Sequence, residues 1–233
     1  MIVVLDTETT GLSPLNGHRI TEIGCLAIEN RVILEDIFFQ TYINPQREVE
    51  QEAVNITGLT NDFLSDKPLF SEIVDDLITY LQSSTALIIH NAPFDLSFLR
   101  HEFKLLGRSF EKEVESKVKI IDSLTLARNK FPGQRNSLDA LVKRYNIGGF
   151  KRNKHGALLD SQILAEVYLQ LTLTQESLFD SNINEPNGNE LISKADKWIC
   201  PDVSKVLVTK ENISEHENFL KMMSSSYGGH NWK

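Results

Sequence analysis

Four carboxylates and one histidine, in three separated stretches of this chain, are the residues best suited to chemistry. Asp6 and Glu8 lie in VVLDTETTG, Asp95 lies in IIHNAPFD, and His155 and Asp160 lie in KHGALLD. Carboxylate oxygens are the ligands that Mg²⁺ and Mn²⁺ prefer. A histidine beside such ions is suited to accept a proton. If folding joins the three stretches, the sequence predicts a site for divalent cations with a base next to it.

The spacing of Asp6 and Glu8 places both side chains on one side of a strand. The apolar residues 2–5 before them are typical of a buried strand, and residues two apart on a strand project from the same face. Two divalent ions about 4 Å apart could hold the attacking and the leaving oxygen of an in-line displacement. Taken singly, each carboxylate, and Asp95 above all, could instead cap a helix or solvate a turn. Together they favour a metal site.

His155 precedes Asp160 by five residues, which on a regular helix would turn the two side chains about 140° apart. The pair makes sense as one site only if His155 lies on an irregular turn before the helix. Gly156, directly after it, allows such a turn. From there the imidazole could take a proton from an attacking water, and activity should then rise with pH as the ring becomes neutral. The alternative is an ordinary surface or packing histidine.

Hydrophobic periodicity predicts the elements that must position these residues. Short apolar runs predict strands, and apolar residues at intervals of three and four predict helices. Strands followed by strand–helix alternation are typical of an α/β domain with a mixed five-stranded sheet. We expect strands at residues 2–6, 20–28, 32–43, 86–90 and 119–122, and helices at 71–82, 94–106, 137–145 and 156–172.

Composition restricts the class of protein. A chain of 233 residues, 41% hydrophobic and 24% charged, fits one sizeable soluble domain with an appendage. No stretch approaches the roughly 18–20 apolar residues of a membrane helix, and the N-terminus lacks the features of a signal peptide. Cys25 and Cys200 lie far apart and match no metal or redox spacing. We therefore predict a cytoplasmic protein with no membrane partner.

The order and spacing of the five site residues resemble the DEDDh family of 3′–5′ exonucleases. The segments DTETTGL, HNAPFD, FPGQRNSLDAL, HGALLDSQILAEVY and the closing HE…W resemble the members that proofread for bacterial replicative polymerases, and the match covers nearly the whole chain. The resemblance implies a ribonuclease H-like fold and two cations, Mg²⁺ or Mn²⁺. It implies that Asp6 bridges both ions, that Glu8 and Asp160 complete the first, and that Asp95 acts at the second or through water.

The resemblance also implies a pocket for the 3′-terminal nucleotide. Thr9 and Leu12 would line it, with Leu12 on the base, although ordinary turn packing would equally explain Leu12. Asn91 is expected to bind substrate or to hold the end of its strand. Family members often carry a histidine before the glycine of NITGLT, where this chain has Thr57. That departure puts one nucleotide contact in doubt and leaves the metal chemistry untouched.

A net charge of −8 is unfavourable for a protein that binds DNA, because Lys and Arg contacts to phosphate supply most of the affinity. Bound cations would cancel part of that charge, and a partner could hold the DNA. We therefore expect weak DNA binding by the isolated chain. Lys151, Arg152 and Lys154 precede His155 and could guide a strand, or they could simply be a solvated face.

Composition changes after Leu173. Residues 1–174 are predicted to form the catalytic domain, residues 175–196 a flexible linker, and residues 197–233 a segment too small to bury a core of its own. Gln175, Leu178 and Phe179 resemble the short peptide that docks replication proteins on a sliding clamp, although the Leu–Phe pair could instead fold back on the domain. Residues 197–233 resemble a segment that anchors the nuclease to its polymerase subunit.

These features together predict a proofreading 3′–5′ exonuclease. It would hydrolyse the terminal phosphodiester of single-stranded or mispaired DNA 3′ ends and release nucleoside 5′-monophosphates. One alternative is a DEDDh exoribonuclease that trims RNA 3′ ends, which leaves the clamp-like peptide without a purpose. Another is a mainly structural subunit of a polymerase, which the complete set of five site residues disfavours. Some relatives bind a small accessory subunit through the catalytic domain, and the sequence leaves open whether this chain does.

Overall fold

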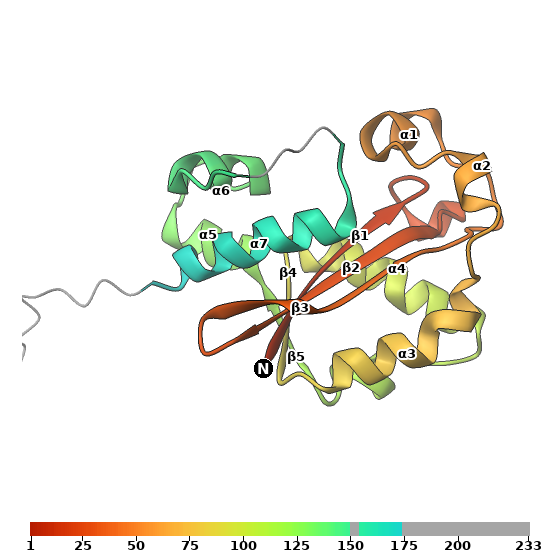
Figure 1. Cartoon of the computed structure of the whole chain (residues 1–233), viewed down its shortest axis with the longest axis horizontal. Helices are drawn as coiled ribbons and strands as arrows, with labels where there is room; N and C mark the ends of the chain where they lie inside the picture. Colours follow the sequence, from red (N-terminus) through yellow and green to blue (C-terminus); the bar gives the residue numbers. More distant parts are fainter. Residues whose placement is uncertain (150–153, 174–233) are drawn as a thin grey trace, which may run out of the picture. The chain divides into compact units, whose positions relative to one another are not determined.

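A computed structural model of the chain describes residues 1–149 and 154–173, which contain a mixed five-stranded sheet (Figure 1). The strand order is β3-β2-β1-β4-β5, in which β1 pairs antiparallel with β2 and parallel with β4. This confirms the predicted sheet. The strands are β1 (Ile2–Thr9), β2 (Ile20–Glu29), β3 (Val32–Tyr42), β4 (Ala86–Ile89) and β5 (Lys119–Asp122). The C-terminal linker and anchor predicted at 175–233 lie outside the described residues.

Four helices were predicted, and all four are present: α3 (Phe70–Gln82), α4 (Ala92–Leu105), α6 (Leu138–Tyr145) and α7 (Ala157–Leu171). Five further helical segments of the described residues, each three to eight residues long, were not predicted. These are the 3₁₀ turn η1 (Pro14–Asn16), the helices α1 (Gln51–Thr57), α2 (Asn61–Leu64) and α5 (Ser123–Lys130), and a π-helical turn, η2 (Glu111–Glu115).

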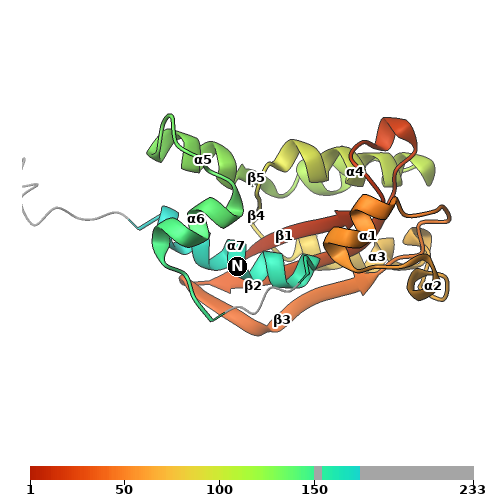
Figure 2. The same ribbon diagram turned by 90° about the horizontal axis from the view of Figure 1, so that it is seen from above.

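The alternation of side chains along β1 divides the core into two layers. Val3 and Leu5 point to the face that packs on α3 and α4, whereas Val4 points to the face that packs on α7. Figure 2 shows α4 and α7 on opposite sides of the sheet. Because the strand continues regularly past its apolar start, the same alternation separates the polar residues at its end.

β1 is longer than predicted and carries both of its acidic residues inside the ladder. It runs to Thr9, with Asp6 opposite Gly24 and Glu8 opposite Glu22 on β2. The register shifts only between Glu8 and Thr9. Asp6 and Glu8 therefore lie on the face that α7 covers, as the two-residue spacing predicts.

Two expectations from composition can be compared with the described residues. Within them, no helix is both long enough and apolar enough to cross a membrane. Cys25 is a buried free thiol on β2, and burial raises the pKa of that thiol, so it is held in its unreactive protonated form. Cys200 lies outside the described residues.

Candidate metal centre and nucleotide pocket

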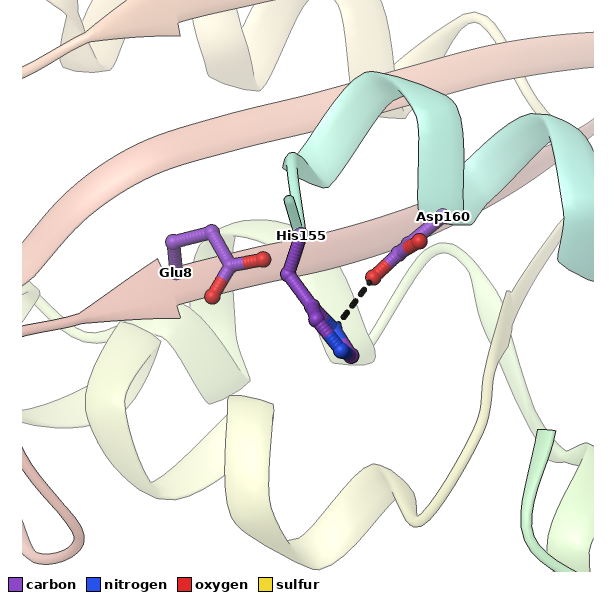
Figure 3. Close-up of side chains that lie close together, drawn as sticks. All are labelled: Glu8, His155 and Asp160. Carbon is purple, nitrogen blue, oxygen red and sulfur yellow. Dashed lines mark hydrogen bonds and ion pairs between the residues drawn. The ribbon is translucent and has the colours of Figure 1, made fainter. Parts of the chain in front are cut away.

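Glu8, His155 and Asp160 converge at the end of β1 (Figure 3). Each offers one ligand atom, and these atoms lie within 4.8 Å of one another. Glu8 comes from β1, His155 from the turn before α7, and Asp160 from the first turn of α7. The structure thus brings together three of the five residues that the sequence predicted to share a site, from segments nearly 150 positions apart.

His155 lies on the turn that the sequence argument required. Its Nδ1 is 3.1 Å from Asp160 Oδ2, and its side chain is 42% exposed. Gly156, the N-cap of α7, has φ −153° and ψ 133°, an extended conformation open to other residues. The prediction that glycine's conformational freedom makes this turn possible was therefore wrong. The chain turns here because the helix begins one residue later.

Two hydrogen bonds attach the turn that carries His155 to α1. The backbone N–H of His155 donates to the carbonyl of Ile56 (3.1 Å), and Lys154 Nζ donates to the carbonyl of Asn55 (2.6 Å). In this structure the Lys154 ammonium therefore serves to hold the turn, and a role in guiding a strand stays a prediction. Lys151 and Arg152 lie outside the described residues.

The first turn of α7 lies directly on β2 because Gly24 has no side chain. A Cβ placed on Gly24 would lie 2.2 Å from the carbonyl carbon of Ala157. Ser161 Oγ donates to the carbonyl of Gly24 (2.8 Å), which holds the helix at this close approach. The contact sets the height of the first turn of α7, which carries Asp160, above the sheet.

Glu22 also contacts α7, and the sequence analysis missed it. It is 1% exposed, and burial raises the pKa of its carboxyl. Its Oε2 accepts a hydrogen bond from the backbone N–H of Ala157 (3.1 Å). A sequence signal did exist, since an acidic residue stands inside the otherwise uncharged run ITEIGCLAI.

Asp95 reaches β1 from the opposite face of the sheet. Its Oδ1 accepts a hydrogen bond from Thr7 Oγ1 (2.7 Å), and Thr7 points away from Asp6 and Glu8. Asp95 is 3% exposed, and burial raises the pKa of its carboxyl to about 7, against the opposing effect of the Thr7 hydrogen bond. Asp95 is thus outside the group formed by Glu8, His155 and Asp160, and its role at a second cation stays a prediction.

A pocket of about 230 Å³ opens next to Glu8 and is lined by three of the predicted substrate residues, Thr9, Leu12 and Thr57. Leu12 is 83% exposed, so its apolar side chain is available for contact with a ligand. Thr57 Oγ1 donates to the carbonyl of Ala53 and accepts from the N–H of Leu59, which fixes the end of α1. The structure therefore places these three residues in the lining of one pocket, together with Glu8.

Two further residues of the pocket connect it to other parts of the protein. Phe94 lines it and, partly buried, also packs against the hydrophobic core. Glu50 lines it as well, and its Oε1 lies 3.2 Å from Nε2 of the buried His18. His18 Nδ1 in turn contacts Thr10 Oγ1 (3.1 Å), so one imidazole joins the loop after β1 to the residue before α1.

Asn91 does not line this pocket. It is the N-cap of α4, with φ 69°, and its backbone N–H donates to Asp122 Oδ1 (3.1 Å). It lines a separate depression of about 540 Å³ together with His90, Arg128 and Asn136. Asn91 therefore lies at the junction between β4 and α4, where its backbone is held by Asp122. This position fits the expectation that it holds the end of its strand.

The donors at the end of β1 suit a divalent cation. Glu8 and Asp160 supply carboxylate oxygens and His155 a ring nitrogen within one small volume, with Asp6 on the same face of β1. Closely spaced carboxylates repel one another unless a cation or a proton is shared among them. Oxygen-rich donor sets favour hard divalent cations such as Mg²⁺ or Mn²⁺.

Comparisons with known proteins identify the family of the chain. A family model described as "Exonuclease" matches residues 3–168. The DNA polymerase III subunit epsilon of Rickettsia prowazekii (strain Madrid E) is 47% identical, over 94% of this chain and 94% of that subunit. The subunit of the same name from Escherichia coli (strain K12) is 41% identical, over 99% of this chain and 96% of that one.

Solved structures confirm the ribonuclease H-like exonuclease fold. The nuclease domain of 3′hExo, a DEDDh family member bound to rAMP, superimposes with a TM-score of 0.63 at 19% identity and covers 73% of this chain and 90% of that domain. Exonuclease X in complex with 5′ overhanging duplex DNA gives a TM-score of 0.54 at 24% identity, with the same coverage. By its sequence relatives, the chain belongs to the Exonuclease family and, within it, to the family of DNA polymerase III epsilon subunits.

Proposed function

We propose that this chain is the proofreading 3′–5′ exonuclease of a replicative DNA polymerase. The observation that carries the proposal is the cluster of Glu8, His155 and Asp160, which adjoins a pocket lined by Thr9 and Leu12. The enzyme hydrolyses the 3′-terminal phosphodiester of single-stranded or mispaired DNA and releases a nucleoside 5′-monophosphate. Membership of the epsilon family supports the same activity.

The carboxylates would hold two divalent cations, Mg²⁺ or Mn²⁺. Asp6 would contribute to both ions, Glu8 and Asp160 to the first, and Asp95 to the second or to water around it. Such ions lower the barrier by activating the attacking water and by stabilising charge on the leaving oxygen. The half-buried position of Glu8 and the burial of Asp160 support this assignment, because the surrounding protein strengthens their attraction to a cation.

His155 is the general base. Its imidazole takes the proton of the attacking water, for which the ring must be neutral. The contact between Nδ1 and Asp160 Oδ2 supports the role because it orients the ring toward the carboxylates. A competing role for His155 as a cation ligand has a different signature. Removing a ligand weakens cation binding, whereas removing a base lowers kcat at saturating cation.

The pocket beside Glu8 receives the 3′-terminal nucleotide. Leu12 packs on the base, with Thr9, Thr57 and Phe94 around it. A terminal nucleotide can enter only when it is unpaired from the template, which favours a mispaired end over a paired one. Because the chain carries a net charge of −8, its own affinity for DNA is weak, and the polymerase supplies most of the substrate delivery.

Residues 175–233, which lie outside the described part of the chain, connect the nuclease to its partners. Residues 197–233 bind the polymerase (alpha) subunit, and Gln175, Leu178 and Phe179 bind the sliding clamp. Residues 175–196 link these to the catalytic domain of residues 1–174. A linker of this kind raises the local concentration of the nuclease at a mispaired end. The complex acts in the cytoplasm, and a small accessory subunit is a further partner.

The decisive experiment measures cation-dependent digestion by the purified chain of three substrates: single-stranded DNA, duplex DNA with a mispaired 3′ end, and short RNA. We expect nucleoside 5′-monophosphates from both DNA substrates, with the mispaired end preferred over a paired one. A clear preference for RNA would favour the exoribonuclease alternative. No digestion of any substrate, from a folded protein with both cations supplied, would leave only the structural role.

The partner assignments need a separate test. Replacing Leu178 and Phe179 together by alanine should abolish binding to the sliding clamp and leave digestion of free single-stranded DNA unchanged. An apolar pair in a polar segment accounts for most of the affinity of such a short peptide. Clamp binding by the doubly substituted chain that equals the wild type would remove this assignment.

A further inference from the structure

We propose that Glu22 is the positioning residue of the active site, whose carboxylate holds the turn between His155 and Asp160 by accepting the backbone N–H of Ala157. The proposal rests on the function proposed above and adds a residue to its machinery. Glu22 acts through the backbone of α7 and touches neither the substrate nor the reacting atoms.

Glu22 joins three elements through its two carboxylate oxygens. Oε1 accepts a hydrogen bond from Gln40 Nε2 on β3 (2.8 Å), and Oε2 accepts one from the N–H of Ala157 on α7 (3.1 Å). Gln40 orients the carboxylate, since a side chain held at one oxygen can present the other in a fixed direction. These two hydrogen bonds therefore link β3, at the edge of the sheet, through Glu22 to the first residue of α7.

The start of α7 needs such an acceptor from elsewhere. Its N-cap is Gly156, which has no side chain that could accept from the first N–H groups. A carboxylate at a helix N-terminus also interacts favourably with the helix dipole, and hydrogen bonds to an ionised acceptor are stronger than neutral ones. Glu22 therefore supplies from β2 the cap that the local sequence lacks.

The anchored residue stands between the two functional side chains. Ala157 follows His155 by two residues and precedes Asp160 by three. Glu22 is also directly opposite Glu8 in the β1–β2 ladder. The Glu22 carboxylate thus fixes the positions of His155 and Asp160 relative to Glu8 on β1. The misplacement of a reacting group by about 1 Å can cost about a hundredfold in rate.

The cost of burying this carboxylate supports a functional reason for it. Residues 20–28 of β2 are all buried, and Glu22 is the only charged side chain among them. A buried carboxylate close to Glu8 and Asp160 adds repulsion that an apolar residue of similar size would avoid. Both of its oxygens accept hydrogen bonds from Gln40 and Ala157, which distinguishes it from a cation ligand.

Two substitutions separate the hydrogen bond from the charge. Glu22→Asp keeps the charge but shortens the side chain by about 1.5 Å, so it no longer reaches Ala157. Glu22→Gln removes the charge, but its amide oxygen can accept from Ala157 while a rotated Gln40 amide accepts from its NH₂ group. We expect kcat to fall about 10- to 100-fold for Glu22→Asp and to stay within about threefold of wild type for Glu22→Gln.

The assays use the full-length chain with Mn²⁺ or Mg²⁺, on p-nitrophenyl thymidine 5′-phosphate and on single-stranded DNA. KM for the small ester should stay within about threefold in both variants, because the pocket is unchanged. The rise of kcat with pH should be flatter in Glu22→Asp alone, because a displaced His155 contributes less as the general base. Glu29→Gln, a change at the exposed end of the same strand, is the matched control.

The pattern of outcomes decides the proposal. Wild-type kcat in Glu22→Asp, or a loss in Glu22→Gln as large as in Glu22→Asp, would overturn it. If Glu22→Asp failed to fold, hydrogen exchange of the Ala157 amide in Glu22→Gln would decide, because the proposal requires that amide to stay protected. Asp6→Ala is measured in parallel. If Asp6→Ala kept its activity, the proposed function itself would fail, independently of Glu22.

Discussion

Two aspartates reach the end of β1 from opposite faces of the sheet, and the protein holds them in different ways. Asp160 comes from α7, on the face of Asp6 and Glu8, and Asp95 comes from α4, on the face of Thr7. Both are almost fully buried. The residue type and the depth of burial are thus the same on the two sides, so the difference lies in what surrounds each carboxylate.

On the α7 side, backbone contacts determine the geometry. The first turn of the helix rests on Gly24, Ser161 is bonded to the Gly24 carbonyl, and Glu22 caps Ala157. The turn that carries His155 is tied to α1 by a further backbone hydrogen bond. Contacts with several elements therefore fix the positions of His155 and Asp160.

On the α4 side, electrostatics are more important than anchoring. Asp95 accepts one side-chain hydrogen bond, from Thr7, and its pKa is raised to about 7 by burial and, to a lesser degree, by the nearby charge of Asp122. A carboxyl in this state is protonated at mildly acidic pH and ionises when a cation arrives. The comparison shows that backbone contacts fix the α7 side of the site, whereas the α4 side carries a buried carboxyl with a raised pKa.

The largest effect should follow from removing Asp6, the carboxylate that is proposed to bind both cations. Asp6→Asn keeps the size of the side chain and removes its charge, and we expect kcat on single-stranded DNA to fall at least about 10³-fold, because a cation loses a ligand. The unfolding free energy should change little, since one like-charge repulsion is relieved at the same time. Thermal denaturation checks the fold. Activity within tenfold of wild type would remove Asp6 from the site.

The next effect tests the chemistry of the α7 side. His155→Gln should lower kcat about 10²- to 10⁴-fold, the usual contribution of a positioned base. The Mn²⁺ concentration that gives half-maximal binding, measured by calorimetry, should remain unchanged. A loss of Mn²⁺ affinity that accounts for the whole loss of activity would make His155 a cation ligand instead of a base.

A smaller effect tests the anchoring itself. Gly24→Ala adds a Cβ that would lie 2.2 Å from the backbone of Ala157, so the first turn of α7 must move. We expect a loss of about 1–3 kcal/mol in unfolding free energy, as for other overpacked sites, and a fall in kcat of about 10- to 100-fold. Gly148→Ala is the control, because no atom lies within 4 Å of the added Cβ. Equal kcat in the two variants would show that the α7 contact does not position the site.

The elements on the two sides were predictable to different degrees. α4 and α7 were predicted because each buries apolar residues at helical spacing over three or more turns. The two-residue spacing of Asp6 and Glu8 also sufficed to place both on one face. Helix α1, which holds the His155 turn and lines the pocket, was missed because its seven residues leave most of its side chains exposed.

The contacts that position the site could not have been predicted from local pattern. Gly24 is an ordinary strand residue until α7 approaches it, and Glu22 is an unexplained acid until it meets Ala157. Both contacts join residues more than 130 positions apart, and no periodicity in a single segment encodes them. Gly156 shows the converse error, since a residue type suited to a turn does not establish that the turn needs it.

The smallest effect concerns the α4 side and depends on pH. The pKa of Asp95 is raised from an ordinary 3.8 to about 7, so between these values the folded, cation-free protein holds a proton that the unfolded chain has released. This contribution to stability is fully present below pH 3.8 and is lost as the pH rises through about 7. The slope is at most about 1.4 kcal/mol per pH unit for one proton.

Asp95→Asn isolates this contribution, because asparagine keeps the shape of the side chain and does not titrate. Denaturation of the cation-free protein between pH 5 and pH 8 should show stability that falls with pH in the wild type and changes less in Asp95→Asn. Cation binding requires the ionised carboxylate, so Mn²⁺ affinity of the wild type should rise over the same range. An equal pH slope in both proteins would mean that Asp95 is already ionised without a cation, and the contrast between the two sides of β1 would then disappear.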